Sequence, residues 1–304
     1  MERGAIDLAT LDGAFDLQST VESGQSYLWN RPDGQMYAES DVHGGDAWYE
    51  TVVSPIPGVS DEAVPIRIRQ QDESLQWEST ADAVPILTHI VRLDDDLAAI
   101  EAKTPPDAML GRAFDRYAGM RLVRDPAFPS LISFICSAQM RVSRIHQMQQ
   151  SLMETYGEPI ELGDNTYYSY PTAETLAART EDELRDLSLG YRAPYVQRTA
   201  EMVATEESDP YDAQSLPYEE ARELLTQFVG VGDKVSDCVL LFSLGFTEPV
   251  PLDTWIQTAI AEYYPDCEKS NYTNTSRAIR ERFGGEFAGY VQTYVFHHLR
   301  NGGE

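Results

Sequence analysis

Residues 228–235, Phe-Val-Gly-Val-Gly-Asp-Lys-Val, decide the fold of this chain. Gly230 and Gly232 allow the backbone to turn tightly and to approach a phosphate group closely. An apolar-periodic segment starts at Lys234, so free backbone N–H groups at the beginning of that helix would face the phosphate. The stretch therefore predicts a phosphate-binding hairpin between two helices, with a lysine in the first turn of the second helix.

Helical periodicity flanks the hairpin on both sides. The preceding segment has one apolar face, made of Ala221, Leu224, Leu225 and Phe228. The following segment presents Val235, Val239, Leu240 and Phe242 to the core. Cys238 lies four positions after Lys234, so it shares the face of the lysine. We expect a helix-hairpin-helix over residues 217–244.

The rest of the chain divides into two parts. Residues 35–39, 47–53 and 64–69 partly alternate apolar and polar side chains, and Gly and Asp turn signals separate them. From about residue 105 the spacing becomes helical, with segments near 128–137, 142–155, 173–188, 194–206, 217–228, 234–244, 254–264 and 286–300. We therefore expect an α+β protein, with an N-terminal antiparallel β domain over 1–100 and a mainly α-helical domain over 101–304.

Composition limits the class of protein. The 304 residues are 42% apolar, which is enough for a substantial core. The longest apolar run, residues 239–242, is too short to span a bilayer, and no targeting sequence opens the chain. The three cysteines are too few and too scattered for a disulfide framework or a four-thiolate iron–sulfur cluster. These features predict a soluble, cytoplasmic protein.

The charge is strongly acidic, with 50 Asp and Glu against 23 Lys and Arg and a net charge of −27. Two interpretations remain open. An acidic protein can simply avoid nucleic acid, because DNA binding depends on neutralising phosphates. Alternatively, an acidic surface with only three lysines is typical of a protein that works in concentrated salt, where self-repulsion is screened. Local arginine pairs, 141 with 144 and 192 with 198, then matter more than the total.

Lys234 is a candidate nucleophile. A lysine at the start of a helix is usually a solvated surface residue. Beside a phosphate-binding hairpin, however, an unprotonated amine can attack a sugar carbon and form a Schiff base. Asp253 precedes an apolar-periodic helix and is a good N-cap. Its carboxylate could also stabilise positive charge that develops on a sugar when a base departs, and the two roles are compatible.

Gln292 and Phe296 lie one turn apart, off the apolar stripe of the last helix. A phenylalanine in such a place is often incidental. Together, however, an amide can pair with the edge of a purine and a ring can stack on it, so the two form a candidate base-binding set. His297 and His298 lack partners at metal-ligand spacing, and we expect no metal site.

With these residues identified, the chain resembles the 8-oxoguanine DNA glycosylase/AP lyase family of the helix-hairpin-helix glycosylase superfamily, and its acidity is typical of a haloarchaeal member. The resemblance covers nearly the whole chain and rests on five segments in order: Ser23–Trp29, Leu131–Ser137, Leu189–Ala193, the hairpin through Cys238, and Ala288–Phe296.

The resemblance implies an enzyme that flips 8-oxoguanine out of duplex DNA, preferably opposite cytosine, and nicks the strand. Lys234 matches the Schiff-base nucleophile and Asp253 its acidic partner. No cofactor would be required, although the hairpin carbonyls could hold a structural monovalent cation. The partner would be double-stranded DNA containing oxidised guanine, with no membrane, and the protein would be a monomer.

Further residues carry over by the same resemblance. Gly24 matches the glycine whose carbonyl accepts the N7–H that distinguishes 8-oxoguanine from guanine. Cys238 and Phe296 match the residues on either side of the extruded base, and Gln292 matches the amide on its Watson–Crick edge.

The DNA contacts implied lie on a different set of residues. Arg144 and Arg192 match the arginines that read the cytosine left behind, with Tyr191 as a wedge beside it. Gln139 stands where the family has an asparagine that fills the vacated stack. Gly230 and Gly232 form the hairpin that binds the backbone.

The sequence also departs from the family. Trp255 occupies a position where eukaryotic members have histidine, His297 and His298 replace part of a segment with a second carboxylate, and Val229 replaces a proline. Two alternatives remain. An alkylated-purine glycosylase would use Asp253 to activate water and would not need Lys234. A non-catalytic DNA-binding module would leave the base-binding set without a purpose.

Overall fold

A computed structural model describes residues 1–38 and 46–303. The N-terminal part contains a four-stranded sheet in the order β1-β4-β3-β2, and every neighbouring pair is antiparallel. Its strands are β1 (Glu2–Asp7), β2 (Tyr49–Val53), β3 (Val64–Gln71) and β4 (Ser74–Ser79). The expected α+β class with an N-terminal antiparallel sheet is therefore confirmed.

Alternation of side chains gives this sheet one buried face. Ile66 and Ile68 on β3 are fully buried, as is Leu75 on β4, because residues two apart on a strand point to the same side. The helix α1 (Leu17–Glu22) lies in this core with Leu17 and Val21. The chain leaves α1 directly into Ser23 and Gly24, so the sheet core anchors the segment that carries Gly24.

The helical body follows the sheet. Its first helices are α2 (Val84–Ile90), α3 (Leu97–Lys103), α4 (Ala108–Arg116), α5 (Ala127–Cys136) and α6 (Val142–Tyr156). A second hairpin, β5 (Pro159–Leu162) and β6 (Asn165–Tyr168), precedes α7 (Ala173–Ala177), α8 (Glu181–Asp186), the 3-10 turn η2 (Gly190–Arg192) and α9 (Ala193–Ala204). The chain then forms α10 (Tyr218–Leu225), α11 (Asp233–Phe242), α12 (Thr254–Tyr263), α13 (Tyr272–Arg282) and α14 (Ala288–Arg300).

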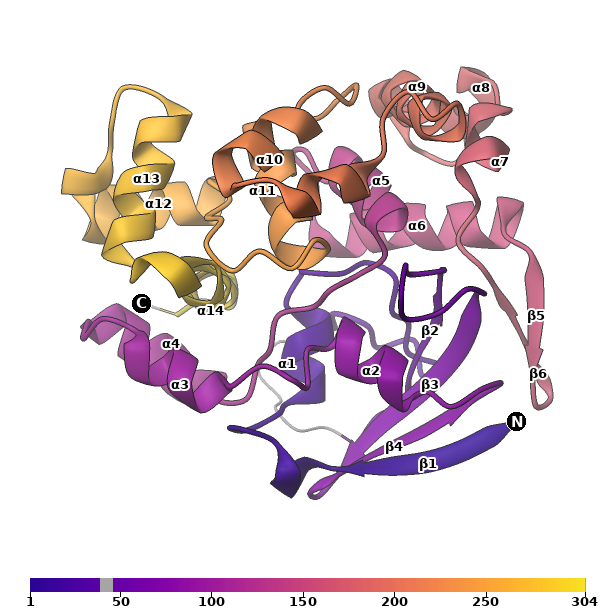
Figure 1. Ribbon diagram of the computed structural model, residues 1–304, viewed down its shortest axis with the longest axis horizontal. Helices are drawn as coiled ribbons and strands as arrows, with labels where there is room; N and C mark the ends of the chain where they lie inside the picture. The colour runs from indigo at the N-terminus through magenta and orange to yellow at the C-terminus, as the bar shows by residue number, and fades with distance from the viewer. Residues whose placement is uncertain (39–45, 304) are drawn as a thin grey trace.

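These elements form a helical layer over the sheet (Figure 1). The hairpin β5–β6 descends from α6 to the sheet, where the Tyr167 hydroxyl donates to the Glu50 carboxylate at 3.0 Å. At the opposite side α4 lies beside α14, so an early segment supports the last helix. The helix α14 is buried on nearly every side, which makes it a rigid support for Gln292 and Phe296.

Several predicted elements differ from the structure. The strand expected at 35–39 is wrong over residues 35–38, which lie outside any strand and turn at 36–38, and residue 39 lies outside the described part. Tyr37 has φ 62°, in the left-handed region, which interrupts an extended strand. The helix expected over 173–188 is two short helices, because Thr180 begins α8 as an N-cap with a capping box to Glu183. Within the described residues, no helix is long and apolar enough to cross a membrane.

Candidate active site

A turn joins α10 and α11 at the predicted position. Gly230 has φ +86°, and a Cβ there would lie 2.7 Å from the Cβ of Tyr195, so a side chain would require the backbone to shift. Gly232 is the N-cap of α11 in an extended conformation and offers no capping side chain. The first N–H groups of α11 are therefore left for a ligand or solvent.

Lys234 lies in the first turn of α11 and is half-buried. Its Nζ donates to the Ser137 Oγ at 3.2 Å and lies 5.6 Å from the centre of the Phe134 ring. Both partners belong to the end of α5. The amine is thus held between two helices instead of extending into solvent, which argues against an ordinary surface lysine.

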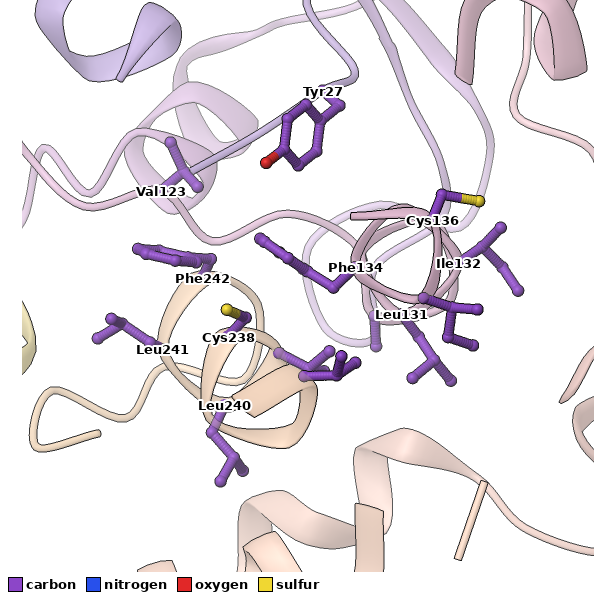
Figure 2. Packing of buried hydrophobic residues seen from close by; sticks show 14 of the residues in the cluster. Tyr27, Val123, Leu131, Ile132, Phe134, Cys136, Cys238, Leu240, Leu241 and Phe242 are labelled. Carbon is purple, nitrogen blue, oxygen red and sulfur yellow. The ribbon is translucent and has the colours of Figure 1, made fainter. Parts of the chain in front are cut away.

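Cys238 is buried one turn after the lysine. Figure 2 shows its sulfur on the side of α11 that faces Phe134, whereas the sulfur of Cys136 points away from this contact. Burial raises the pKa of the Cys238 thiol to about 11, although the nearby charge of Lys234 lowers it. The thiol is therefore neutral at ordinary pH, and Cys238 provides an apolar, polarisable wall and not a second nucleophile.

Asp253 caps α12, as the sequence predicted. Its carboxylate accepts the backbone N–H of Ile256 at 2.8 Å. Burial raises the pKa of Asp253, while the cap and the charge of Lys234 oppose that rise. The capping bond fixes the direction of the carboxylate, and the electrostatic contact with Lys234 indicates that the two groups belong to one site.

The residues of the expected base-binding set line one small cavity. It has a volume of about 50 Å³ and includes Gly24, Lys234, Cys238, Asp253, Gln292 and Phe296. A water molecule needs roughly 10–15 Å³ of such space, so the cavity holds only a few waters. The set is assembled before any ligand binds, but a planar base can enter only if a wall moves.

A larger cleft opens beside this cavity. It has a volume of about 860 Å³ and shares Tyr27, Lys234, Asp253 and Phe296 with the small cavity. Gln139 and Arg141 at the turn before α6 and Trp255 at the start of α12 also line it. The Lys234 amine therefore lies where the small cavity meets the larger cleft.

A family model matches residues 132–284, the part that carries α5, the hairpin and Asp253. This is the HhH-GPD superfamily base excision DNA repair protein family. The chain belongs to this family.

Individual relatives of this HhH-GPD protein extend the match to the whole chain. A Methanothermobacter thermautotrophicus protein named as a probable N-glycosylase/DNA lyase is 30% identical over 96% of this chain and 95% of its own length. The N-glycosylase/DNA lyase of Saccharomyces cerevisiae is 29% identical over 86% of this chain and 71% of its own. Among solved structures, an 8-oxoguanine glycosylase/lyase of Clostridium acetobutylicum in complex with 8-oxoguanine-containing DNA has a TM-score of 0.81 and 25% identity, covering 95% of this chain and 93% of that chain.

The remaining expected DNA contacts of this HhH-GPD protein lie outside the cavity. Tyr191 on η2 is 57% exposed, with the Arg192 guanidinium 4.3 Å from its ring centre. Arg144 is exposed on α6 and donates to the Gln147 side chain at 3.1 Å. Gln139 is exposed and has φ 55°, so the turn that carries it is held in a left-handed conformation.

Arg192 differs from the other three because it is only 3% exposed and donates to the Ala138 carbonyl. Its guanidinium is therefore occupied by the protein in this structure. To contact a base, Arg192 would have to release the Ala138 carbonyl, and the turn between α5 and α6 would have to move.

Positively charged side chains remain available around the site, although the protein as a whole is strongly acidic. Within residues 1–38 and 46–303, no carboxylate lies within 4 Å of Arg141, Arg144, Arg192 or Lys234. By contrast, Arg198 pairs with Glu201 at 2.9 Å and Glu207 at 2.6 Å. The prediction that Arg192 and Arg198 form a cationic cluster is therefore wrong, because two glutamates neutralise Arg198. The predicted pair of Arg141 and Arg144 keeps its positive charge.

Sequence reasoning missed several residues that complete the site. Ser137 and Phe134 contact the lysine amine, and both lie in the Leu131–Ser137 segment that carried the family resemblance. Tyr27 lines both cavities and lies in another such segment. Arg300 also lines the larger cleft, and no local sequence pattern pointed to it. His297 and His298 are buried, and the described residues contain no group of three or more potential metal ligands.

Proposed function

We propose that this protein is a bifunctional DNA glycosylase and AP lyase that excises 8-oxoguanine from duplex DNA, preferably opposite cytosine. The observation that carries the proposal is the meeting of the Lys234 amine and the Asp253 carboxylate in one small cavity beside the hairpin, at the edge of the larger cleft. Relatives across nearly the full chain bear names with the same pair of activities, and the structural neighbour from C. acetobutylicum contains DNA with 8-oxoguanine.

The chemistry begins at the sugar. The unprotonated Nζ of Lys234 attacks C1′, and the bond from C1′ to N9 breaks with its electron pair leaving on the base, which then takes a proton. Asp253 stabilises the positive charge that develops on the sugar. The adduct nitrogen loses one proton, its lone pair then breaks the C1′–O4′ bond, and O4′ takes a proton, which leaves a protonated Schiff base between Nζ and C1′.

Strand cleavage follows from the Schiff base. The iminium group acidifies the C2′ proton, and its removal expels the 3′ phosphate by β-elimination. Hydrolysis of the product imine then returns free Lys234. The Ser137 hydroxyl, 3.2 Å from Nζ, holds the amine at the mouth of the cavity through these steps.

The base pocket supplies selectivity. The Gly24 carbonyl accepts the N7–H of 8-oxoguanine, which guanine lacks, while Cys238 and Phe296 contact the two faces of the base. Gln292, whose Nε2 now donates to the Thr293 hydroxyl at 2.8 Å, turns its amide to the Watson–Crick edge. A site built to hydrogen-bond a substrate N–H rejects an analogue without it far better than an apolar pocket could.

The opposite strand contacts the surface around the α5–α6 turn and η2. Tyr191 wedges into the duplex, Arg144 and Arg192 read the cytosine, and Gln139 occupies the vacated stack. Extrusion of the base costs a few kcal/mol, which these contacts offset. The hairpin residues Gly230 and Gly232 bind the backbone phosphate next to the lesion.

The rivals fit the site less well. An alkylated-purine glycosylase that activates water with Asp253 has no use for an amine held by Ser137 and Phe134. A non-catalytic module has no use for a buried recess that joins residues from the segment after α1, from α11 and from α14. We also propose that the protein is a cytoplasmic monomer and that its net charge of −27 is an adaptation to concentrated salt. Unfolding monitored by circular dichroism tests this adaptation: stability should rise from dilute to molar salt, and a flat response refutes it.

Borohydride trapping tests the catalytic proposal. Wild type with an 8-oxoguanine:cytosine duplex, at high salt, should give a covalent adduct, and Lys234→Gln should give none. Lys269→Gln is the matched control, since Lys269 is an exposed lysine whose Nζ donates only to the Asp266 carbonyl. Equal trapping by Lys234→Gln and wild type refutes the nucleophile. An adduct with abasic DNA but no release of 8-oxoguanine refutes the substrate.

A further inference from the structure

Arg300, the last residue of α14, reaches across the molecule to the end of α1. Its Nη1 donates to the Ser23 carbonyl at 2.7 Å, and its Nη2 donates to the Glu22 carbonyl at 2.9 Å. The same guanidinium lies 5.5 Å from the centre of the Phe296 ring. One side chain therefore joins the segment before Gly24 to Phe296.

Two backbone carbonyls and the His297 Nδ1, 3.1 Å from Nη2, hold this guanidinium, and no carboxylate among residues 1–38 and 46–303 pairs with it. The nearby Glu22 carboxylate accepts hydrogen bonds from Arg31 at 3.1 Å and from the backbone of Tyr37 at 3.0 Å. Burial lowers the pKa of Arg300, so its position has an electrostatic cost. A salt bridge on the surface would not carry this cost of burial. The buried position of Arg300 therefore indicates that the orientation of its two donors toward the backbone carbonyls is what matters.

Arg300 and Phe296 also lie close to Gly24 itself. Gly24 has φ +95°, and a Cβ built on it would lie 2.9 Å from the Arg300 Nη1 and 3.5 Å from the Phe296 ring. On the other side of Gly24, the Gln25 side chain donates to the Arg121 carbonyl at 3.0 Å and accepts from the Val123 N–H at 3.1 Å. Gln25 therefore fixes the chain after Gly24, and Arg300 fixes the chain before it.

We propose that Arg300 is the positioning residue that sets the Gly24 carbonyl relative to the Phe296 ring, and that it thereby controls discrimination between 8-oxoguanine and guanine. The proposal rests on the function proposed above and adds a residue that acts through Gly24. Arg300 itself need not touch the base.

The physical reason lies in the fork of the guanidinium. Two donors in one plane fix both the position and the direction of two consecutive carbonyls, which a lysine with a single flexible ammonium cannot do. A hydrogen bond weakens steeply when its atoms move beyond about 3.2 Å or out of line. A shift of the Gly24 carbonyl by half an ångström or more would therefore remove the contact that identifies the lesion, while leaving Lys234 in place.

The test compares base release with abasic-site cleavage by the same full-length protein. We measure single-turnover release of 8-oxoguanine, release of guanine from a matched duplex, and cleavage of a preformed abasic site. Arg300→Lys should lower the ratio of 8-oxoguanine to guanine release by roughly 10- to 100-fold, the range for losing one or two oriented hydrogen bonds. Cleavage of the abasic site, which needs Lys234 but no base contact, should stay within about twofold.

Arg179→Lys is the matched control. Arg179 donates to the Thr175 carbonyl at the end of α7 at 3.1 Å and lies 5.4 Å from the centre of the Tyr156 ring, so it makes the same two kinds of contact away from the cleft. This variant should leave the ratio unchanged. If it lowers the ratio as much as Arg300→Lys, the effect is general destabilisation and the proposal is wrong.

A double-mutant cycle with Gly24→Ala separates the remaining outcomes. If Arg300 acts through Gly24, Arg300→Lys should add little to the loss already caused by Gly24→Ala, and fully multiplicative losses refute the proposal. Equal losses of base release and abasic-site cleavage, or no loss in either, also refute it. Failure of wild type to prefer 8-oxoguanine over guanine instead refutes the substrate proposed above, which keeps the two failures distinct.

Discussion

Replacement of Asp253 separates its capping role from its chemical role. Asn retains a side-chain oxygen that can accept the N–H of Ile256, whereas Ala removes both the cap and the charge. We expect both Asp253→Asn and Asp253→Ala to lose activity. We expect Asp253→Asn alone to be more stable than wild type at neutral pH, because it keeps the cap and removes a buried charge.

The size of the stability difference follows from the capping hydrogen bond and the length of the chain. Loss of an N-cap costs about 1 kcal/mol. For a chain of 304 residues with an unfolding entropy of about 2.1 cal/mol/K per residue, this loss should place the Tm of the Ala variant roughly 2 °C below that of the Asn variant. Loss of electrostatic stabilisation at the sugar should lower the rate of base release by about 10²- to 10³-fold in both variants.

The pH dependence gives a second check on the same side chain. Burial raises the pKa of Asp253, so the folded protein holds this proton more tightly than the unfolded chain does. The contribution of Asp253 to stability therefore falls as pH rises from its unfolded pKa through its folded pKa. The advantage of Asp253→Asn should be largest above the folded pKa and should vanish in acid.

The assays are thermal unfolding from acid to neutral pH and single-turnover release of 8-oxoguanine. A Tm for Asp253→Asn at or below that of Asp253→Ala refutes the capping argument. Base release by Asp253→Asn within a few fold of wild type refutes the catalytic argument. The two results are independent, so either role can fail alone.

Three further predictions concern the surroundings of the site. Ser137→Ala removes the hydroxyl that holds the Lys234 amine, and the rate of borohydride trapping should fall about five- to tenfold; an unchanged rate contradicts this. Burial raises the pKa of Asp125 to about 7, so wild type should lose stability between about pH 4 and pH 7, and Asp125→Asn should lessen that loss, as pH-dependent unfolding would show. Gly289→Ala should cost about 1–3 kcal/mol in chemical unfolding, because its Cβ would lie 2.3 Å from Leu241 Cδ1; a neutral variant would show that α14 can shift.

The fold was predictable where periodicity is strong. The segments near 128–137, 142–155 and 254–264 match α5, α6 and α12 within two residues, because each buries one continuous apolar stripe. The short helices α1 to α4 were missed, since each spans only two or three turns, which is too short a segment for periodicity to identify a helix. The strand β1 was missed because it is an edge strand with an exposed pattern. The domain boundary near residue 100 stays a prediction.

The site was predictable to the extent that its residues share a local motif. Lys234, Cys238 and Asp253 lie in or beside the hairpin, so spacing alone relates them. Gln292 could be named from its helical spacing to Phe296, although it meets the hairpin residues only through tertiary packing. Gly24 also meets them only through tertiary packing, and resemblance to a family was needed to name it. Nothing local could indicate Arg300, because its partners are carbonyl groups 277 and 278 positions away.

The closed state of the small cavity affects how well free nucleobases can compete with DNA for the site. A purine that is free in solution has no strand through which to use the DNA contacts proposed for Tyr191 and the arginines around it. Such a molecule would have to open a cavity of about 50 Å³ with its own binding energy alone. Free nucleobases, including the released product, should therefore be weak inhibitors, and the pocket becomes available mainly to a base that arrives attached to DNA.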